Sequence, residues 1–202
     1  MIELKLATPK AVKYACLNFH YAKSVPSVSY GFNVYEDGEW CGVILFGLGA
    51  TKNIASPFGL NQGEVLELVR VALNGKQSTT SQCVAAALKK LHQMNPLCKI
   101  VVSYADIDQD HAGIIYQATN WIYLGQMNEG SRSAFVINGK KTHPRTIGSM
   151  GGVQSLKWVR ENLDANAEEF RTKGKHKYIF AFDKRLRKEY QKQHQPYPKK
   201  LE

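Results

Sequence analysis

The stretch EVLELVRVALNGKQSTTSQCVAAALKKLHQMNPLCKIVVSY, residues 64–104, decides the fold class. Its first ten residues form an apolar run that predicts a strand. Thr79 and Gln82 then have the spacing of a helix capping box. The apolar stripe of the helix that follows consists of Val84, Leu88 and Leu91, at i, i+4 and i+7. Residues 99–104 are a short continuous apolar run, which is typical of a central strand. This order of strand, capped helix and strand indicates a mixed α/β protein.

The segments before this stretch extend the pattern. Residues 2–6 alternate like a strand, and the next segment has helical spacing with Pro9 in its first turn. Residues 29–47 predict a hairpin that turns at Asp37–Gly38. The order of the elements is that of the GNAT acyltransferase fold. We therefore predict a GNAT-like mixed central sheet flanked by helices.

The segments after it complete the sheet and add a basic end. We predict a strand around WIYLG, a hairpin turned at Asn138–Gly139, helices in SLKWVRENL and AEEFRTKG, and a late strand in HKYIFAFD. The tail after Lys184 is basic, and we expect it to be helical and then frayed. We expect residues 1–150 to form a catalytic core and residues 151–202 to form a basic C-terminal segment packed on it, in one domain overall.

Composition excludes some classes of protein. The chain has 202 residues, of which 44% are hydrophobic, so it can form a real core. It has no apolar run of about 18 residues, and its first residues lack the apolar region of a signal peptide. Four cysteines are scattered without a CxxC pair, which favours reduced thiols over a disulfide or zinc site. We expect a cytoplasmic protein without a membrane span.

The charge is unevenly distributed. The formal net charge is +10. Residues 140–202 hold 16 Lys and Arg against 7 Asp and Glu, a net +9, whereas residues 1–139 hold 11 against 10, a net +1. A basic surface of this kind suits a polyanion such as nucleic acid, and it is equally consistent with a solvated surface that keeps the protein soluble.

The stretch SYADIDQDHAGIIYQATNWIYLG, residues 103–125, raises a choice between a metal loop, a helix cap and an active site. Asp106, Asp108 and Asp110 have the 1-3-5 spacing of a calcium loop. Positions 6 and 12 of that loop hold His111 and Gln117 instead of Gly and Glu, so the calcium interpretation fails and we predict no metal site. Asp108 or Asp110 is a plausible helix cap, whereas Asp106 ends a strand, where sites in α/β sheets gather.

Helical geometry divides the residues that follow. The expected core face consists of Ile114, Ile115, Ala118 and Ile122. Tyr116 lies about 200° around the helix from Ile114, which predicts that its side chain points away from the core. Such a tyrosine is either amphipathic surface or a phenol placed to give a proton to a leaving group.

At this point the chain resembles the Mom family of phage DNA-modification proteins. Besides residues 103–125, the matching segments are NFHYAKSVPS at 18–27, ELVRVAL at 67–73, the following TTS, FVINGKKTHPRTIG at 135–148 and YIFAFDKRLRK at 178–188. The resemblance covers most of the chain. It implies a GNAT-related transferase that converts adenine N6 in phage DNA to an acetamido (methylcarbamoyl) form, which protects the DNA from host restriction enzymes. It also implies a location in the bacterial host cytoplasm.

The resemblance implies roles for His20, Tyr21, Arg70, Ser81, Asp106 and Tyr116, and the need for aromatic pocket walls and for a basic surface adds the other candidates. The catalytic candidates are His20, Ser81, Asp106 and Tyr116. The substrate-binding candidates are Tyr21, Arg70 and Tyr104. The candidate contacts to double-stranded DNA are His143, Arg145, Lys184, Arg185, Arg187 and Lys188. Because N6 faces inward in a duplex, we expect the adenine to be flipped out of the stack.

Several of these residues have a structural alternative. His20 is equally well explained as a half-buried, hydrogen-bonded histidine. A salt bridge between Arg70 and Asp106 is as good an explanation as substrate binding, because a buried guanidinium needs a partner. Ser81 either assists the helix cap or helps to hold an anionic cofactor.

The group donor is open. GNAT enzymes that use acetyl-CoA carry a glycine-containing loop, Q/R-x-x-G-x-G/A, between this strand and helix, whereas this chain has NGKQSTTSQ with only Gly75. Acetyl-CoA or another acyl or aminoacyl donor remains possible. The alternative functions are a conventional acetyl-CoA-dependent acetyltransferase acting on a protein or small-molecule amine, and a DNA-binding protein without enzymatic activity.

Overall fold

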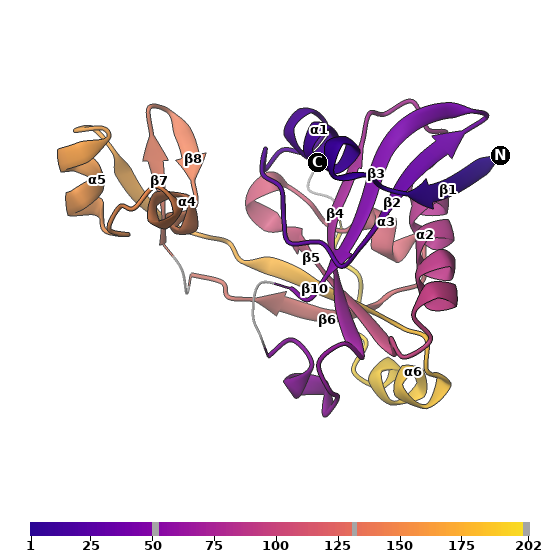
Figure 1. Cartoon of the computed structure of the whole chain (residues 1–202). Helices are drawn as coiled ribbons and strands as arrows, with labels where there is room; N and C mark the ends of the chain where they lie inside the picture. Colours follow the sequence, from indigo (N-terminus) through magenta and orange to yellow (C-terminus); the bar gives the residue numbers. More distant parts are fainter. Residues whose placement is uncertain (50–52, 131–132, 200–202) are drawn as a thin grey trace. The chain divides into compact units, whose positions relative to one another are not determined.

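A computed structural model describes residues 1–49, 53–130 and 133–199, and it contains a seven-stranded and a three-stranded sheet (Figure 1). The chain divides into two compact units. The larger unit comprises Met1–Tyr104, Gly113–Gly125 and Lys177–Lys199. The described part of the smaller unit comprises Ala105–Ala112 and Gln126–His176, without the undescribed residues 131–132. The functional division that we expect near residue 150 stays a prediction.

The seven-stranded sheet has the order β1-β2-β3-β4-β5-β10-β6. The bounds of its strands are β1 (Ile2–Leu6), β2 (Tyr30–Glu36), β3 (Glu39–Gly47), β4 (Val65–Leu73), β5 (Ile100–Asp106), β6 (Ile122–Met127) and β10 (Lys175–Ala181). The first four strands pair antiparallel, and β4 pairs parallel to β5. The mixed sheet and the central place of β5 confirm the predicted α/β fold class.

The β2–β3 hairpin forms where the sequence predicts it. Asp37 and Gly38 both have positive φ, at 51° and 84°, as a type I′ turn requires. This turn matches the twist of the two strands, which pair from Tyr30↔Phe46 to Glu36↔Glu39. The hairpin is therefore encoded locally by its Asp-Gly pair.

Two features of β4 interrupt the regular sheet. Its pairing with β5 runs only from Val65↔Ile100 to Glu67↔Val102. One residue further along, its register with β3 shifts between Leu45 and Phe46. The β4–β5 ladder thus ends at mid-strand, and the candidate site described below lies at this position.

Two helices pack on this sheet, α1 against β3 and β4, and α2 against β1 and β2. Helix α1 (Pro9–Asn18) is capped by the Thr8 hydroxyl, which accepts from Ala11 N, and it buries Val12, Ala15 and Cys16. Helix α2 (Thr80–Met94) buries the predicted stripe Val84, Leu88 and Leu91 together with Cys83 and Ala87. Thr79 is the N-cap of α2, but its side chain makes no capping bond, so the predicted capping box does not form.

The segment after β5 is less helical than the sequence predicts. It contains a 3₁₀ turn, η2 (Ile107–Gln109), and a single helical turn, α3 (Ile114–Gln117). The N-cap of α3 is Gly113, with φ 75° and no side-chain capping bond, so the prediction that Asp108 or Asp110 caps this helix was wrong. Asp106 provides a cap instead, because its side chain accepts from Asp108 N at the start of η2.

The described residues after β10, up to Lys199, are bound to the sheet and are not frayed. Helix α6 (Lys184–Gln191) begins at Asp183, whose carboxylate accepts from Leu186 N, and buries Leu186 and Tyr190. The residues after it follow the edge strand β6. Tyr123 N donates to His194 Nδ1 at 3.0 Å, Gln195 N donates to Tyr123 O at 3.0 Å, and Tyr197 Oη donates to Trp121 O at 2.6 Å. The tail thus covers an edge that would otherwise be open to another strand.

The smaller unit contains the three-stranded sheet, in the order β8-β7-β9. Its elements are β7 (Ser133–Ile137), β8 (Lys140–Thr142), α4 (Pro144–Ser149), α5 (Leu156–Asn162) and β9 (Glu168–Arg171). The Asn138–Gly139 turn and the helix α5 are confirmed. The helix predicted in AEEFRTKG was wrong, because Glu168–Arg171 pairs antiparallel with β7 and this tertiary pairing overrides local helical propensity.

All four cysteines are buried and free, as expected for reduced thiols. Burial raises the pKa of Cys83 to about 11 and that of Cys98 to about 12, so these thiols are inert core residues. Within the described ranges, none of the helices has the length and apolar character needed to cross a membrane.

Candidate active site

Tyr116 lies in the core of the larger unit. Its side chain is 8% exposed, whereas Ile114, two residues earlier, is 51% exposed. The prediction that Tyr116 points away from the core was therefore wrong. The predicted faces require a helix of several turns. Helix α3 has a single turn after its N-cap Gly113, so its side chains do not alternate regularly between two faces. The ring of Tyr116 packs against Trp121 and Tyr178, with centroids 5.0 Å and 5.1 Å away.

The phenol of Tyr116 makes a hydrogen bond to Ser103 on β5. The two oxygens are 2.8 Å apart, and Ser103 Oγ is also 3.0 Å from the carbonyl oxygen of Leu68 on β4. Ser103 is 1% exposed. It is the residue after the last β4–β5 pair, so its hydroxyl bridges the strands where their ladder ends. Burial raises the pKa of Tyr116, the Ser103 hydrogen bond lowers it, and the charge of Glu67 raises it.

Glu67 is a charged residue that was not among the predicted site residues. It pairs with Val102 at the end of the β4–β5 ladder and is partly buried. Burial, with the carboxylate of Glu67 as a second cause, raises the pKa of Tyr104 to about 12. A phenol with such a pKa stays protonated at neutral pH. The signal in the sequence was an acidic residue, Glu67, between apolar residues of the run EVLELVRVAL.

The loop after α1 brings other candidates together. The rings of His20 and Tyr21 lie 4.3 Å apart at 31°, and Tyr21 is 48% exposed. Arg70 donates from Nη1 to Val69 O at 2.7 Å and from Nη2 to Ser24 Oγ at 3.3 Å. Its Nε is buried and has no hydrogen-bond partner among the residues described. Arg70 thus fastens this loop to β4.

The N-terminus of α2 holds Ser81 in its first turn, as predicted. The residue before its N-cap, Ser78, donates to Glu36 from both its backbone N–H, at 2.6 Å, and its hydroxyl, at 2.9 Å. A carboxylate therefore occupies the loop that precedes the helix. The positive end of a helix favours such a negative group.

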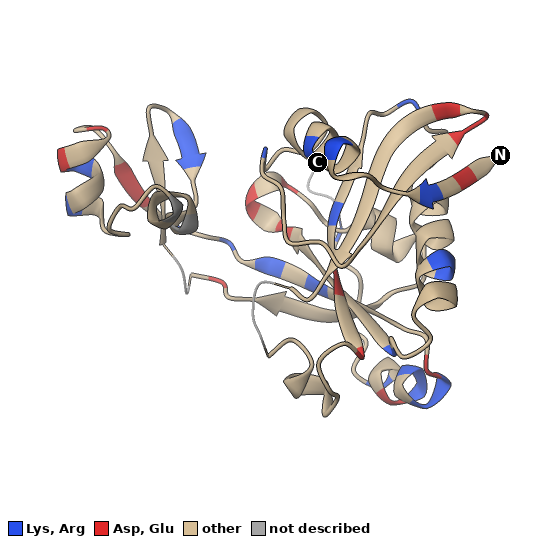
Figure 2. Cartoon of the chain, viewed as in Figure 1, with Lys and Arg blue, Asp and Glu red and all other residues tan. Residues whose placement is uncertain are grey.

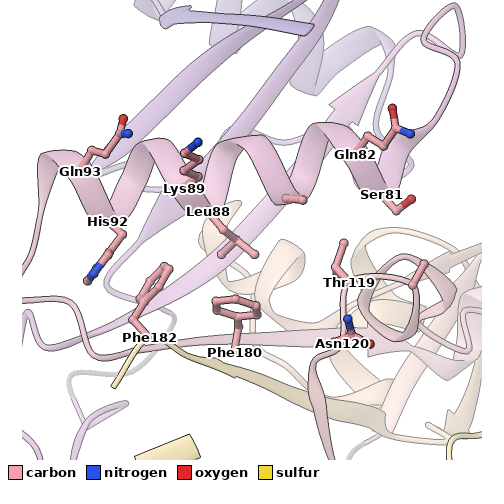
Figure 3. Close-up of a pocket in the computed structure, with 12 residues that line it drawn as sticks. Ser81, Gln82, Leu88, Lys89, His92, Gln93, Thr119, Asn120, Phe180 and Phe182 are labelled. Carbon is pink, nitrogen blue, oxygen red and sulfur yellow. The ribbon is translucent and has the colours of Figure 1, made fainter. Parts of the chain in front are cut away.

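A groove runs along α2 within the larger unit (Figure 3). It has a volume of about 610 Å³ and begins at Ser81. Leu88 and His92 point from α2 towards Phe180 and Phe182 on the other side (Figure 3). The ring of His92 stacks on Phe182 at 4.4 Å and 11°. The groove therefore has apolar walls at Leu88, Phe180 and Phe182, with polar side chains at both ends, Ser81 and Gln82 at one and His92 and Gln93 at the other.

These residues fit part of a coenzyme A-like group donor, because its pyrophosphate is the kind of anion that a helix N-terminus binds. The Ser81 hydroxyl and the first-turn N–H groups of α2 suit an anionic group, and Thr79 does not cap them. The preceding loop does not fit, because the Ser78 donors are already bound to Glu36. Any anionic group would thus be held by α2 itself, with an apolar arm in the groove.

Asp106 belongs to the smaller unit, whereas Tyr116 and Arg70 belong to the larger one. The Asp106 carboxylate lies 3.9 Å from Lys175 Nζ, and Asp108 accepts from Lys173 N at 3.2 Å. The expected convergence of Asp106 with Tyr116 and its salt bridge with Arg70 both remain predictions. In the part of the chain that is described, no three His, Cys, Asp or Glu side chains form a group that would hold a metal ion.

Four of the candidate DNA contacts lie on α6, where Figure 2 shows a group of Lys and Arg residues. On α6, Lys184, Arg185 and Lys188 are exposed. Arg187 is different, because its guanidinium lies over the Phe180 ring at 5.7 Å and Nη2 is 3.5 Å from Asn120 O. His143 is exposed directly before α4, and Arg145 lies in α4 with its side chain outside what the structure describes.

The fold of this protein is similar to the folds of solved acetyltransferases. The structure is similar to a Bacillus subtilis acetyltransferase in complex with CoA, at TM-score 0.52 and 10% identity over 91% of this chain and 100% of that chain. It is also similar to the spermidine/spermine N-acetyltransferase SpeG from Vibrio cholerae, at TM-score 0.52 and 11% identity over 93% and 99%. These likenesses confirm the GNAT-like fold.

Sequence comparison is more specific. The chain is 27% identical to "Methylcarbamoylase mom" of Escherichia phage Mu over 192 residues, which cover 89% of this chain and 76% of that protein. The profile of the Mom protein family matches residues 1–199. The match extends over nearly the whole chain, and the chain belongs to the Mom protein family.

Proposed function

We propose that this protein is a transferase that converts adenine N6 in phage DNA to the acetamido (methylcarbamoyl) form and thereby protects the DNA from host restriction enzymes. The family match over residues 1–199 carries this proposal. The name of the phage Mu relative, a methylcarbamoylase, supports the type of group transferred. The GNAT-like fold supports transfer to an amine, as in the spermidine/spermine N-acetyltransferase.

The adenine must leave the duplex before its amine can react, because N6 faces the opposite strand in the stack. The half-exposed ring of Tyr21, beside His20, is suited to contact a flipped base, and Tyr104 is a second candidate wall. Arg70 holds the loop that carries His20 and Tyr21. His20 or Asp106 would accept the proton that N6 loses.

Tyr116 would act as the general acid. Its buried phenol has a raised pKa, so it carries its proton at neutral pH and can give that proton to the leaving group. The group donor would lie in the groove along α2. Ser81 and the first turn of α2 would hold an anionic part of it, as in a coenzyme A thioester or another acyl or aminoacyl donor.

Basic side chains would hold the DNA phosphates. The candidates are His143, Arg145, Lys184, Arg185, Arg187 and Lys188. The exposed cations on α6 are suited to phosphate contacts, which set affinity and register without reading sequence. Such contacts require no sequence motif in the DNA.

Mass spectrometry of nucleosides from the DNA of cells that express this protein tests the proposal. We expect N6-acetamido adenine from the wild type and unmodified adenine from Tyr116→Phe at equal soluble expression. Unmodified adenine from the wild type would overturn the function. Acetylated protein or small-molecule amines in the same cells would instead identify a conventional acetyltransferase, and DNA retention without any product would identify a binding protein.

A further inference from the structure

In the part of the chain that the structure describes, the buried polar residues are Asn33 and Ser103. Asn33 has a structural explanation, since it bonds to Trp40 Nε1 and to Leu6 O. Ser103 bonds instead to the phenol that we propose as the general acid.

The hydrogen bonds of Ser103 fix the direction of the Tyr116 proton. A serine hydroxyl has one hydrogen, and a backbone carbonyl oxygen can only accept. Ser103 Oγ lies within hydrogen-bonding distance of both Leu68 O, at 3.0 Å, and Tyr116 Oη, at 2.8 Å. With Tyr116 protonated, Ser103 therefore donates to Leu68 O and accepts from Tyr116. The resting phenol points its proton at Ser103.

We infer that Ser103 is a positioning residue that stabilises Tyr116 when this phenol gives up its proton. In that step the O–H bond of Tyr116 breaks, its proton moves to the leaving group, and the electron pair stays on Oη. The Ser103 hydroxyl then turns its single hydrogen from Leu68 O to the phenolate. Once the products have left the site, a proton from water restores the phenol. This inference rests on the proposed role of Tyr116.

The surroundings of Tyr116 increase the effect of the Ser103 hydrogen bond on the stability of the phenolate. Tyr116 is 8% exposed and packed between Trp121 and Tyr178, so water has little access to its phenolate. The carboxylate of Glu67 further opposes a negative charge on Tyr116. A hydrogen bond to a charged group in such surroundings is stronger than one between neutral groups. Among the residues that the structure describes, Ser103 is thus the hydrogen-bond partner of the Tyr116 phenol that can favour the phenolate.

A purely structural role for Ser103 makes a different prediction. If its hydroxyl served only to bind Leu68 O where the β4–β5 ladder ends, its removal would lower thermal stability and leave the acidity of Tyr116 unchanged. Thr8→Ala is the matched control for this case. It also removes one hydroxyl bonded to the backbone, at the cap of α1, and lies outside the candidate site.

The acidity of residue 116 can be measured without turnover. A fluorotyrosine placed at position 116 gives a single fluorine signal whose shift reports ionisation of this phenol alone. We expect the ionisation midpoint to rise in Ser103→Ala, to rise less in Ser103→Cys, which keeps the size and a weaker donor, and to stay unchanged in Thr8→Ala. DNA modification should fall about 10- to 100-fold in Ser103→Ala and less in Ser103→Cys.

An unchanged midpoint in both Ser103 variants overturns the inference, even where the wild type modifies DNA. A lower thermal midpoint with unchanged acidity does the same, because it assigns Ser103 a structural role. If Ser103→Ala does not fold, the Ser103→Cys midpoint decides. Unmodified adenine in the wild-type culture, by contrast, overturns the proposed function itself.

Discussion

The carboxylate of Glu36, at the end of β2, accepts two hydrogen bonds from Ser78, one from its backbone N–H and one from its hydroxyl. Ser78 directly precedes the N-cap of α2. Glu36 thus holds a negative charge beside the positive end of the helix, at the place where the fold would bind an anionic group donor. This contact has opposite effects on stability and on ligand affinity.

Replacing Glu36 with Gln should separate these two effects. The loss of the charge at the helix N-terminus should lower the free energy of unfolding by up to about 1 kcal/mol. The same change should tighten the binding of an anionic ligand such as coenzyme A, because a repelling carboxylate is gone. Chemical denaturation and titration calorimetry measure the two quantities. Glu3→Gln, at an exposed position of β1, is the control. Weaker coenzyme A binding by Glu36→Gln than by the wild type would mean that the donor binds elsewhere.

Two substitutions test the catalytic candidates. Tyr116→Phe keeps the ring packed against Trp121 and removes the hydroxyl. Asp106→Asn keeps a side chain that can cap η2 and removes the charge that faces Lys175. Loss of a general acid or base lowers a rate by about 10²- to 10⁴-fold. We expect both variants to fold, to bind DNA and to leave adenine essentially unmodified in a nucleoside assay.

Asp108→Asn is the matched control for Asp106→Asn, because it removes a neighbouring carboxylate in the same turn, bonded to Lys173 N. It should retain near wild-type modification. If Asp106→Asn unfolds the protein, Asp106 is a structural residue and its catalytic role should be dropped. Near wild-type modification by both Asp106→Asn and Tyr116→Phe would show that neither residue is catalytic.

The sequence predicts the sheet better than the site. The Asp-Gly and Asn-Gly turns, the stripe of α2 and the apolar run of β5 are local signals, and each element forms as predicted. The face of Tyr116 was wrong because a helix of one turn has no regular periodicity. Residues 168–171 form a strand because β7 offers a partner, which local propensity does not reveal. The contacts of Ser103 and Glu67 likewise depend on where β4 and β5 stop pairing.

Alkaline pH should destabilise the fold. The pKa of Tyr104 and that of Tyr178 are each raised from 10 to about 12, in both cases mainly by burial. The folded state therefore keeps both phenols neutral where the unfolded chain ionises. The stability from this difference is fully present below pH 10 and is lost as the pH rises from 10 to about 12. Thermal unfolding followed by circular dichroism over this range measures the loss.

Glu67→Gln gives this pH dependence a residue-level check. Without its charge the pKa of Tyr104 should fall, so phenolate absorbance should develop at lower pH than in the wild type. Glu3→Gln should leave the absorbance titration unchanged. A thermal midpoint that does not move between pH 10 and 12, or identical absorbance titrations for Glu67→Gln and the wild type, would contradict the electrostatic account of this region.

The exposed cations of α6 give the last prediction. Lys184, Arg185 and Lys188 are exposed, whereas Arg187 is engaged with Phe180 and Asn120, so only the first three can be replaced without loss of packing. Each phosphate contact contributes about 0.9 to the slope of log K against log salt. Replacing all three with Gln should weaken binding to duplex DNA and reduce that slope by up to about 2.7. Fluorescence anisotropy at several salt concentrations measures the affinity and its salt dependence.

The charge-matched control replaces three exposed lysines of β1 and α1, Lys5, Lys10 and Lys13, with Gln. An equal loss of affinity in both triple variants would mean that net charge, and not the α6 surface, sets DNA binding.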